Sequence, residues 1–193
     1  MKKINKAVLS GLVVMGLTVS TSTYAAGVSI LPVTQEDYKP EAVISVMGGM
    51  MDPTQEGADS STILGAELSF RCILLQVGDN QLRQQLSFTT WEKDSLTLQN
   101  IELNAHYQVA VANDLKVGVG PGFGVVMTDL SGSDNPTFFG AQLGASLHYT
   151  GMGPVFLGAE ARYQVTNKDK MISGGTEDNL NNWRAAVKVG YIF

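Results

Sequence analysis

The sequence predicts an all-β protein, an eight-stranded antiparallel up-and-down transmembrane β-barrel. Eight segments alternate between apolar and polar residues with a period of two, which is the pattern of a strand with one apolar face. The links between these segments are alternately short and long, as in barrels with tight turns at one end and loops at the other. Beyond residue 25 no run reaches about 18 apolar residues, so the sequence excludes a transmembrane helix.

The last segment shows the alternation most clearly. From Trp183 to Phe193, apolar and aromatic side chains occupy one face, and the opposite face carries Arg184 and Lys188. A strand with one apolar face that has aromatic residues at both ends suits the crossing of a bilayer. The eight predicted strands cover residues 42–51, 61–74, 82–91, 99–109, 115–127, 138–149, 155–165 and 183–193.

Two places fit the alternation poorly. The run from Cys72 to Leu75 has no polar face, and the side-chain parity changes between Leu98 and Ile101. We expect a β-bulge at the second place, because one extra residue reverses the alternation. Cys72 is the only cysteine, so it cannot form an internal disulfide, and we expect it to be a small apolar residue on the lipid face.

The links predict which end of the barrel faces which side of the membrane. Residues 76–81, 110–114 and 150–154 are short links rich in turn residues, whereas residues 52–60, 92–97, 128–137 and 166–182 form mostly longer links. We expect the short links in the periplasm, together with both ends of the chain, and the longer links outside. Aromatic residues then fall at both rims, as they do at membrane interfaces: Tyr107, Tyr149, Tyr191 and Phe193 at the periplasmic rim, and Phe139, Tyr163 and Trp183 at the outer rim.

The start of the chain has the pattern of a secretory signal peptide. A lysine-rich segment precedes an apolar run from Ala7 to Val19 and a small, polar stretch that ends near Ala25. We predict that residues 1–25 are a cleaved signal peptide, residues 26–40 a short periplasmic lead and residues 41–193 the barrel domain. The signal contains three Lys and no acidic residue, so its removal changes the net charge from −5 to −8. This negative charge argues against nucleic acid as a partner.

The terminal residues Val189, Gly190, Tyr191, Ile192 and Phe193, together with the eight-strand pattern, resemble the small eight-stranded bacterial outer-membrane barrels. This group includes outer membrane protein X, opacity proteins and the transmembrane domain of outer membrane protein A. The resemblance covers about residues 40–193. It implies a monomeric protein of the bacterial outer membrane, in contact with lipid and lipopolysaccharide. It also implies that Tyr191 and Phe193 form the signal that the barrel-assembly machinery reads.

The inward face of the predicted barrel carries the concentrated chemistry. Ionisable side chains inside a membrane must face the interior and pair with one another or with water. The predicted lumen network consists of Glu67, Arg71, Arg83, Glu102, His106, Lys116, His148, Glu160, Arg162, Arg184 and Lys188. Because an eight-stranded barrel is just wide enough for its own side chains, we expect a polar plug. The six basic residues against three carboxylates leave a gated solute or ion path as an alternative.

Inward glycines at positions 118, 120, 122 and 124 leave room for long side chains from the other walls. They lack the last glycine of a dinucleotide-binding fingerprint, so we predict no nucleotide and no other cofactor. The acidic links offer oxygen ligands for divalent cations between lipopolysaccharide phosphates, but none matches a calcium-binding loop. We therefore assign no metal site.

An enzyme needs a nucleophile, a base and an orienting acid. Ser146, His148 and Glu160 face inward on neighbouring strands, and the lipid A deacylase family uses the same three residue types on an eight-stranded barrel. Here the order of Ser and His is reversed, and the residues face the lumen instead of lipid. A turn centred near Met152 would pair Glu160 with Gly144, roughly 13 Å along the strand from His148. We therefore assign no catalytic residue.

The sequence favours a non-enzymatic outer-membrane barrel that supports the envelope or contacts other molecules through its external loops. The longest link, residues 166–182, is the best candidate for contact with an extracellular ligand. A lipid A modifying enzyme and a narrow channel for small solutes or ions are the alternatives.

Overall fold

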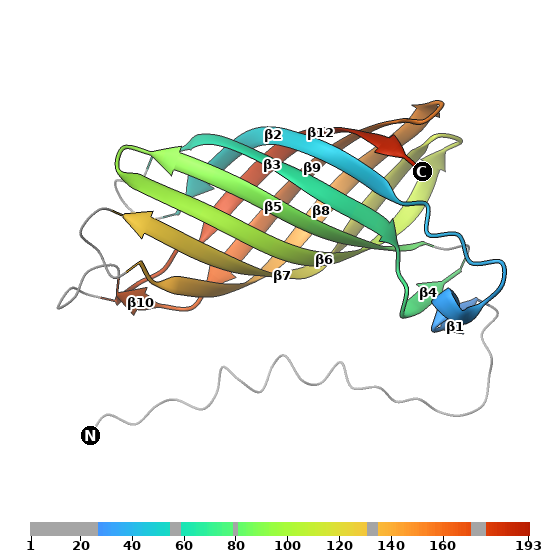
Figure 1. The fold of residues 1–193 in the computed structure, drawn as a ribbon, viewed down its shortest axis with the longest axis horizontal. Helices are drawn as coiled ribbons and strands as arrows, with labels where there is room; N and C mark the ends of the chain where they lie inside the picture. The colour runs from blue at the N-terminus through green and yellow to red at the C-terminus, as the bar shows by residue number, and fades with distance from the viewer. Residues whose placement is uncertain (1–26, 55–58, 79–80, 131–134, 171–176) are drawn as a thin grey trace, which may run out of the picture.

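The computed structural model describes residues 27–54, 59–78, 81–130, 135–170 and 177–193, and these form a closed antiparallel β-barrel (Figure 1). Eight strands close the ring in the order β12, β2, β3, β5, β6, β7, β8 and β9. The predicted fold class is therefore confirmed. The predicted signal peptide, residues 1–25, lies outside the described residues. No helix in the described ranges is long and apolar enough to span a membrane.

Six of the eight barrel strands are longer than the sequence pattern indicates, and β3 and β12 are not. The eight strands are β2 (Val43–Pro53), β3 (Ser61–Arg71), β5 (Leu82–Lys93), β6 (Leu96–Ala112), β7 (Leu115–Leu130), β8 (Thr137–Met152), β9 (Val155–Thr166) and β12 (Asn182–Ile192). Four short elements lie outside the ring: β1 (Val28–Ile30), the 3-10 helix η1 (Pro32–Thr34), β10 (Asp169–Lys170) and β11 (Glu177–Asp178). A fifth, β4 (Leu75–Val77), pairs with β1.

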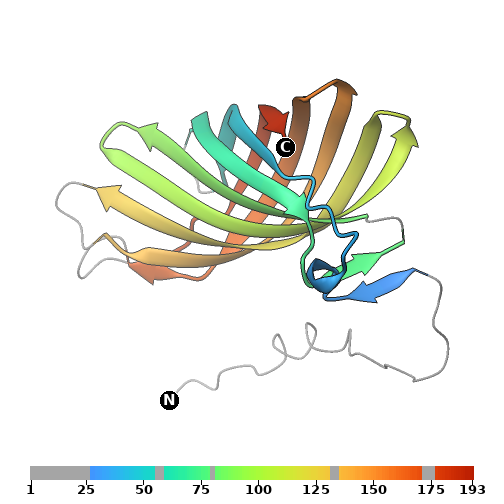
Figure 2. The same cartoon turned by 45° about the vertical axis from the view of Figure 1, so that its right-hand side comes forward.

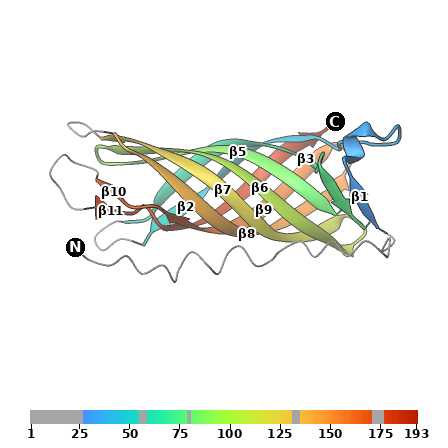
Figure 3. The ribbon, with the colours of Figure 1, turned by 90° about the horizontal axis from the view of Figure 1, so that it is seen from below.

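The two ends of the barrel differ, and Figure 3 shows one at the right of the view and the other at the left. One end, which we call the turn end, holds the C-terminus and the turns at residues 113–114 and 153–154. The opposite end, which we call the loop end, holds the links between β2 and β3, β5 and β6, β7 and β8, and β9 and β12. The strands run obliquely between these ends (Figure 2).

The alternation along β12 has the predicted direction. Trp183, Val187 and Tyr191 are exposed on the outer face, whereas Arg184 and Lys188 are buried in the lumen. The other barrel strands repeat the same inside-out pattern, with apolar side chains toward the lipid and polar side chains inside. Because the interior is polar, the apolar outer belt is the surface that a bilayer covers.

The predicted bulge between Leu98 and Ile101 is wrong. β5 and β6 pair without interruption through this segment, and Leu98 points inward and is buried. The parity changes because the lumen contains an apolar layer near the loop end, not because a residue is inserted. An irregularity in β6 lies instead at Ala110 to Ala112, next to the turn at the opposite end.

Two further boundaries differ from the sequence prediction. The link predicted at residues 92–97 is only two residues long, because β5 ends at Lys93 and β6 begins at Leu96. The strand predicted at residues 61–74 ends at Arg71, and the chain then leaves the ring. Cys72 is consequently buried at the turn end instead of facing lipid, as its 4% exposure shows.

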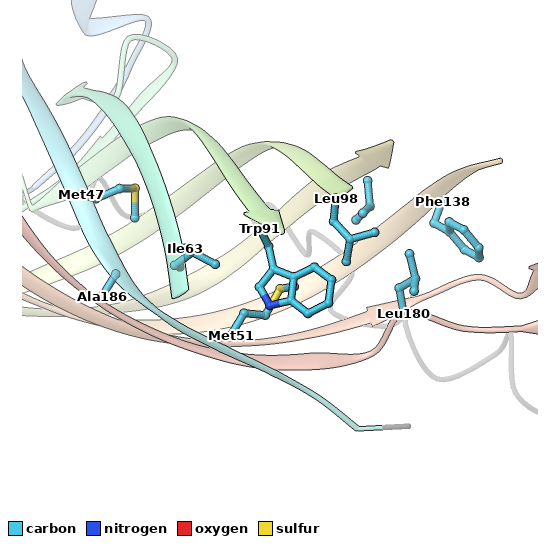
Figure 4. Packing of buried hydrophobic residues seen from close by; sticks show 9 residues of the cluster. Met47, Met51, Ile63, Trp91, Leu98, Phe138, Leu180 and Ala186 are labelled. Atoms are coloured by element: carbon cyan, nitrogen blue, oxygen red, sulfur yellow. The ribbon is translucent and has the colours of Figure 1, made fainter. Parts of the chain in front are cut away.

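Apolar residues also pack inside the barrel, near the loop end (Figure 4). Trp91 lies at the centre of this layer, beside Met51 and Leu98. The full layer consists of Met47, Met51, Ile63, Trp91, Leu98, Val126, Phe138, Leu180 and Ala186. It lies on the loop side of the charged residues, so the barrel interior has an apolar layer followed by an ionic one.

Candidate functional site

Arg162 is the centre of the ionic layer. Its guanidinium lies 2.5 Å from Glu102 Oε2, 2.6 Å from Glu160 Oε2 and 3.2 Å from Glu67 Oε2. It also donates hydrogen bonds to Ser87 Oγ at 3.1 Å and Gln85 Oε1 at 3.3 Å. One side chain therefore contacts all three buried carboxylates, and its planar fork of donors suits that geometry.

Two further cations complete the layer. Lys188 Nζ lies 2.5 Å from Glu160 Oε2 and forms a second ion pair with Glu67. Arg184 pairs with Glu102 and donates a hydrogen bond to Gln142 Oε1 at 2.6 Å. Each of the three carboxylates thus has at least two contacts to a cation. The layer carries three positive and three negative charges, so it is neutral as a unit.

The ion pairs cross the lumen. Arg162 and Glu160 come from β9, and Arg184 and Lys188 come from β12, which pairs with β9. Glu67 comes from β3 and Glu102 from β6, which lie on either side of β5. The network therefore ties opposite walls of the barrel together across its axis.

Inward glycines on two neighbouring strands make this crossing possible. On β7 and β8, a Cβ at Gly124 would lie 2.6 Å from Gln164 Nε2, and one at Gly144 would lie 3.1 Å from Arg162 Cγ. At these distances, an added methyl group would require the side chains of Gln164 and Arg162 to shift. Long side chains from neighbouring strands thus fill the space beside the inward glycines.

The remaining predicted lumen residues lie nearer the turn end. Arg71 pairs with Glu41, and Arg83 donates to Ser69 Oγ at 3.1 Å and to the Glu41 carbonyl at 2.8 Å. Lys116, near the start of β7, is only half-buried. These three basic residues are therefore separate from the central layer, and the expected excess of six cations over three carboxylates does not occur there.

Both histidines are buried in the lumen. His106 Nδ1 lies 2.8 Å from Ser146 Oγ, and His148 Nε2 lies 3.4 Å from Gln85 Nε2. The His148 ring also meets the edge of Phe156, with centroids 5.1 Å apart. These contacts place both imidazoles between the ionic layer and the turn end.

The register of β8 and β9 differs from the one expected for Ser146, His148 and Glu160. Glu160 pairs directly opposite Ser146 instead of Gly144, because the chain turns at residues 153–154. The hydroxyl of Ser146 contacts His106, and Glu160 pairs with Arg162 and Lys188. The three residues therefore form no chain of nucleophile, base and acid.

The predicted site set left out the apolar layer and the neutral polar partners. Trp91 continues the inward parity of Arg83, Gln85, Ser87 and Thr89 on β5, so alternation alone places it in the lumen. The neutral groups are as important as the ions, since Ser87 and Asn100 both donate to the Glu102 carboxylate, at 3.2 and 2.8 Å.

The ends of the barrel carry different chemistry. At the loop end, the hydrogen bond from Lys93 holds the pKa of the Asp59 carboxyl below its ordinary value. At the turn end, Tyr191 and Phe193 contact each other edge to face, with centroids 5.0 Å apart. The backbone N–H of Phe193 donates to the Ala42 carbonyl at 2.9 Å, which closes the last strand onto the chain before β2. No group of three or more potential metal ligands gathers within the described ranges.

The chain matches the family described as outer membrane protein beta-barrel domain over residues 12–193. It belongs to that family. Membership places this outer-membrane barrel in the bacterial outer membrane, in contact with lipid. It agrees with the closed ring of eight strands and with their apolar outer faces.

Solved structures with the same fold include three bacterial barrels. Neisserial surface protein A is 20% identical, with a TM-score of 0.56, and the match covers 79% of this chain and 96% of that one. The N-terminal barrel of Pseudomonas aeruginosa OprF is 17% identical, with a TM-score of 0.55 and coverages of 80% and 98%. Yersinia pestis Ail is 16% identical, with a TM-score of 0.52 and coverages of 81% and 100%. No curated protein matches the chain significantly.

Proposed function

We propose that this outer-membrane barrel is non-enzymatic and that its loop end makes adhesion-like contacts or supports the envelope. The observation that carries this proposal is the filled lumen, in which Arg162 joins three carboxylates from three strands. Between the ionic and apolar layers, Trp91, Asn100 and Gln164 border a cavity of about 10 Å³. That volume holds about one water molecule, so this part of the lumen is tightly packed, as a plug requires.

The loop end is the surface left for a partner. Its exposed acidic residues within the described ranges are Asp52, Asp59, Glu92, Asp94, Asp129, Asp169 and Glu177. Lys168 and Lys170 are the exposed basic residues of the same surface, again among described residues. Ail has been solved with the heparin analogue sucrose octasulfate. The acidic surface of this chain would repel such a polyanion, so we propose a cationic or neutral extracellular ligand.

The longest link is the first candidate for that contact. Within residues 166–182, β10 and β11 form a short hairpin that projects from the loop end (Figure 1). We further propose that the loop end is extracellular, that the protein is monomeric and that the barrel-assembly machinery inserts it. An epitope inserted at Gly174 and Gly175 should then be labelled on intact cells. Labelling that requires permeabilised cells would contradict this orientation.

Three measurements on the wild-type protein separate the candidate functions. Purified barrel in a planar bilayer should give no steady current, and lipid A from producing and non-producing cells should have the same mass spectrum. Barrel in nanodiscs should bind an immobilised cationic polypeptide more strongly than heparin, and replacing residues 167–181 with a short turn should remove that binding. A matched change at the turn of Asn113 and Asp114 should leave the binding intact. A steady ion-selective current would identify a channel, and a lipid A mass shift would identify an enzyme.

A further inference from the structure

Seven apolar side chains are exposed outside the ring of strands at the turn end: Val33 of η1 and six others that lie on or next to β1 and β4. The six are Val28, Ile30, Leu31, Ile73, Leu74 and Leu75, and we call them the apolar ledge. Ile30 pairs with Leu75 across the β1–β4 sheet, and the Leu31 N–H donates to the Leu74 carbonyl at 2.8 Å. The ledge is thus one continuous surface, and Ile30 is 76% exposed. A soluble protein rarely leaves such a surface uncovered.

The small sheet has the inside-out alternation of the barrel itself. Along β4, Leu75 is exposed and Gln76 is buried, and along β1, Val28 and Ile30 are exposed while Ser29 is partly covered. A sheet facing water on one side shows the reverse, with polar residues out and apolar residues in. The polar residues of this sheet face the protein, and its apolar residues face the surroundings.

Hydrogen bonds fix this sheet to the barrel wall. The Gln76 amide donates to the Cys72 and Leu82 carbonyls at 3.0 and 2.9 Å, and its oxygen accepts from the Leu82 N–H at 3.2 Å. The Cys72 N–H donates to the Leu82 carbonyl at 2.8 Å, and Tyr38 Oη donates to the Arg71 carbonyl at 2.7 Å. The ledge is therefore held in a fixed position relative to the first residue of β5.

That position is at the level of the membrane interface. Leu82 pairs with Tyr107, one of the exposed aromatic residues near the turn end. Aromatic residues of this kind mark the boundary between hydrocarbon and headgroups. The Ile73 N–H lies 3.5 Å from Gln84 Oε1, and Gln84 is on the outer face of β5, nearer the middle of the barrel than Leu82. The ledge thus begins on the lipid side of the wall.

We propose that the apolar ledge inserts into the lipid leaflet at the turn end and anchors the segment before the barrel to the membrane surface. The ledge continues the lipid-facing belt, because Leu68 on β3 and Leu86 on β5 are exposed on the same wall. An amphipathic element that lies in the interface with its apolar side in the acyl region is an established mode of membrane contact. This continuity favours lipid over a second protein.

A fluorescent probe on the ledge tests the proposal. Ile30→Cys, labelled with an environment-sensitive NBD group in the folded barrel in lipid vesicles, should emit at shorter wavelength than labelled Glu36→Cys. Glu36 is an exposed polar residue just after η1, so it provides the matched control. Doxyl groups on the lipid chains should quench the probe at residue 30 several-fold more than the probe at residue 36. The native Cys72 can stay in place because it is buried. Labelling of the protein without an added cysteine gives the background signal from Cys72.

Two results would overturn the proposal. Equal emission and equal quenching at residues 30 and 36 would mean that water covers the ledge. A blue-shifted probe that lipid-borne doxyl groups do not quench, and whose shift grows with the protein-to-lipid ratio, would mean that a second copy covers it. If Ile30→Cys reduces the folded yield, Leu74→Cys can be labelled instead, because Leu74 is exposed on the same surface, directly before β4.

Discussion

Replacing Arg162 with Met tests the plug most directly. The change removes the cation that contacts Glu67, Glu102 and Glu160, and methionine keeps an unbranched side chain that is uncharged and shorter than that of arginine. Glu102 retains Arg184, and Glu67 and Glu160 retain Lys188. No carboxylate loses its last cation, so the layer changes from neutral to one surplus negative charge. The expected cost is that of one broken buried pair, about 3–5 kcal/mol of unfolding free energy.

The assay is urea unfolding of the barrel in lipid vesicles, followed from both directions by tryptophan fluorescence and by the heat-modifiable band in gels. Two matched variants interpret the result. Arg162→Met combined with Glu160→Gln restores a neutral layer and should recover part of the loss. Lys93→Met removes an ion pair in which the Asp59 side chain is 78% exposed, so its expected cost is about 0–1 kcal/mol.

An unfolding midpoint for Arg162→Met equal to that of the wild type would refute the reasoning. So would a double variant less stable than the single one, because the surplus carboxylate would then not be the source of the cost. A steady current through Arg162→Met, absent from the wild type, would show that the layer also seals the lumen.

Three further predictions concern the C-terminal residue, a tightly packed glycine in β7 and the apolar layer. Deleting Phe193 should slow membrane insertion and expose the chain to periplasmic proteases, measured by the amount of heat-modifiable protein. Gly120→Ala would place a Cβ 1.8 Å from the Ala105 carbonyl oxygen and should cost about 1–3 kcal/mol in urea unfolding, whereas Gly48→Ala, with its nearest atom at 3.6 Å, should be nearly neutral. Trp91→Ala should cost about 3–5 kcal/mol in the same assay, because it empties the centre of the apolar layer. An unchanged unfolding midpoint would show that packing around Trp91 does not stabilise the barrel.

Local alternation explains what could be predicted about the candidate site. In a strand, successive side chains point to opposite faces, so Arg184 and Lys188 had to share the face opposite Trp183 and Val187. The same rule gave the lumen positions of Glu67, Glu102 and Glu160, because a charged residue in a membrane strand faces inward. Neither inference depends on which strands are neighbours in the barrel.

Pairing across the lumen could not be predicted in this way. Arg162 and Glu67 are 95 positions apart, and Lys188 and Glu67 are 121 apart, so their contact depends on the closure and stagger of the whole ring. The predicted partner of Glu160 was wrong by two residues for a more local reason, because the position of the turn after β8 sets which residue of β8 it pairs with.

The sequence by itself determined the fold class, the number of strands in the ring and the face on which each charge lies, because these follow from a period of two and from the cost of charges in lipid. Only the tertiary structure decided that Leu98 is inward, that Cys72 is buried and that β4 leaves the ring to pair with β1. In each of these cases an apolar side chain has two apolar environments available, the bilayer and the protein interior. Alternation cannot choose between them, and packing does.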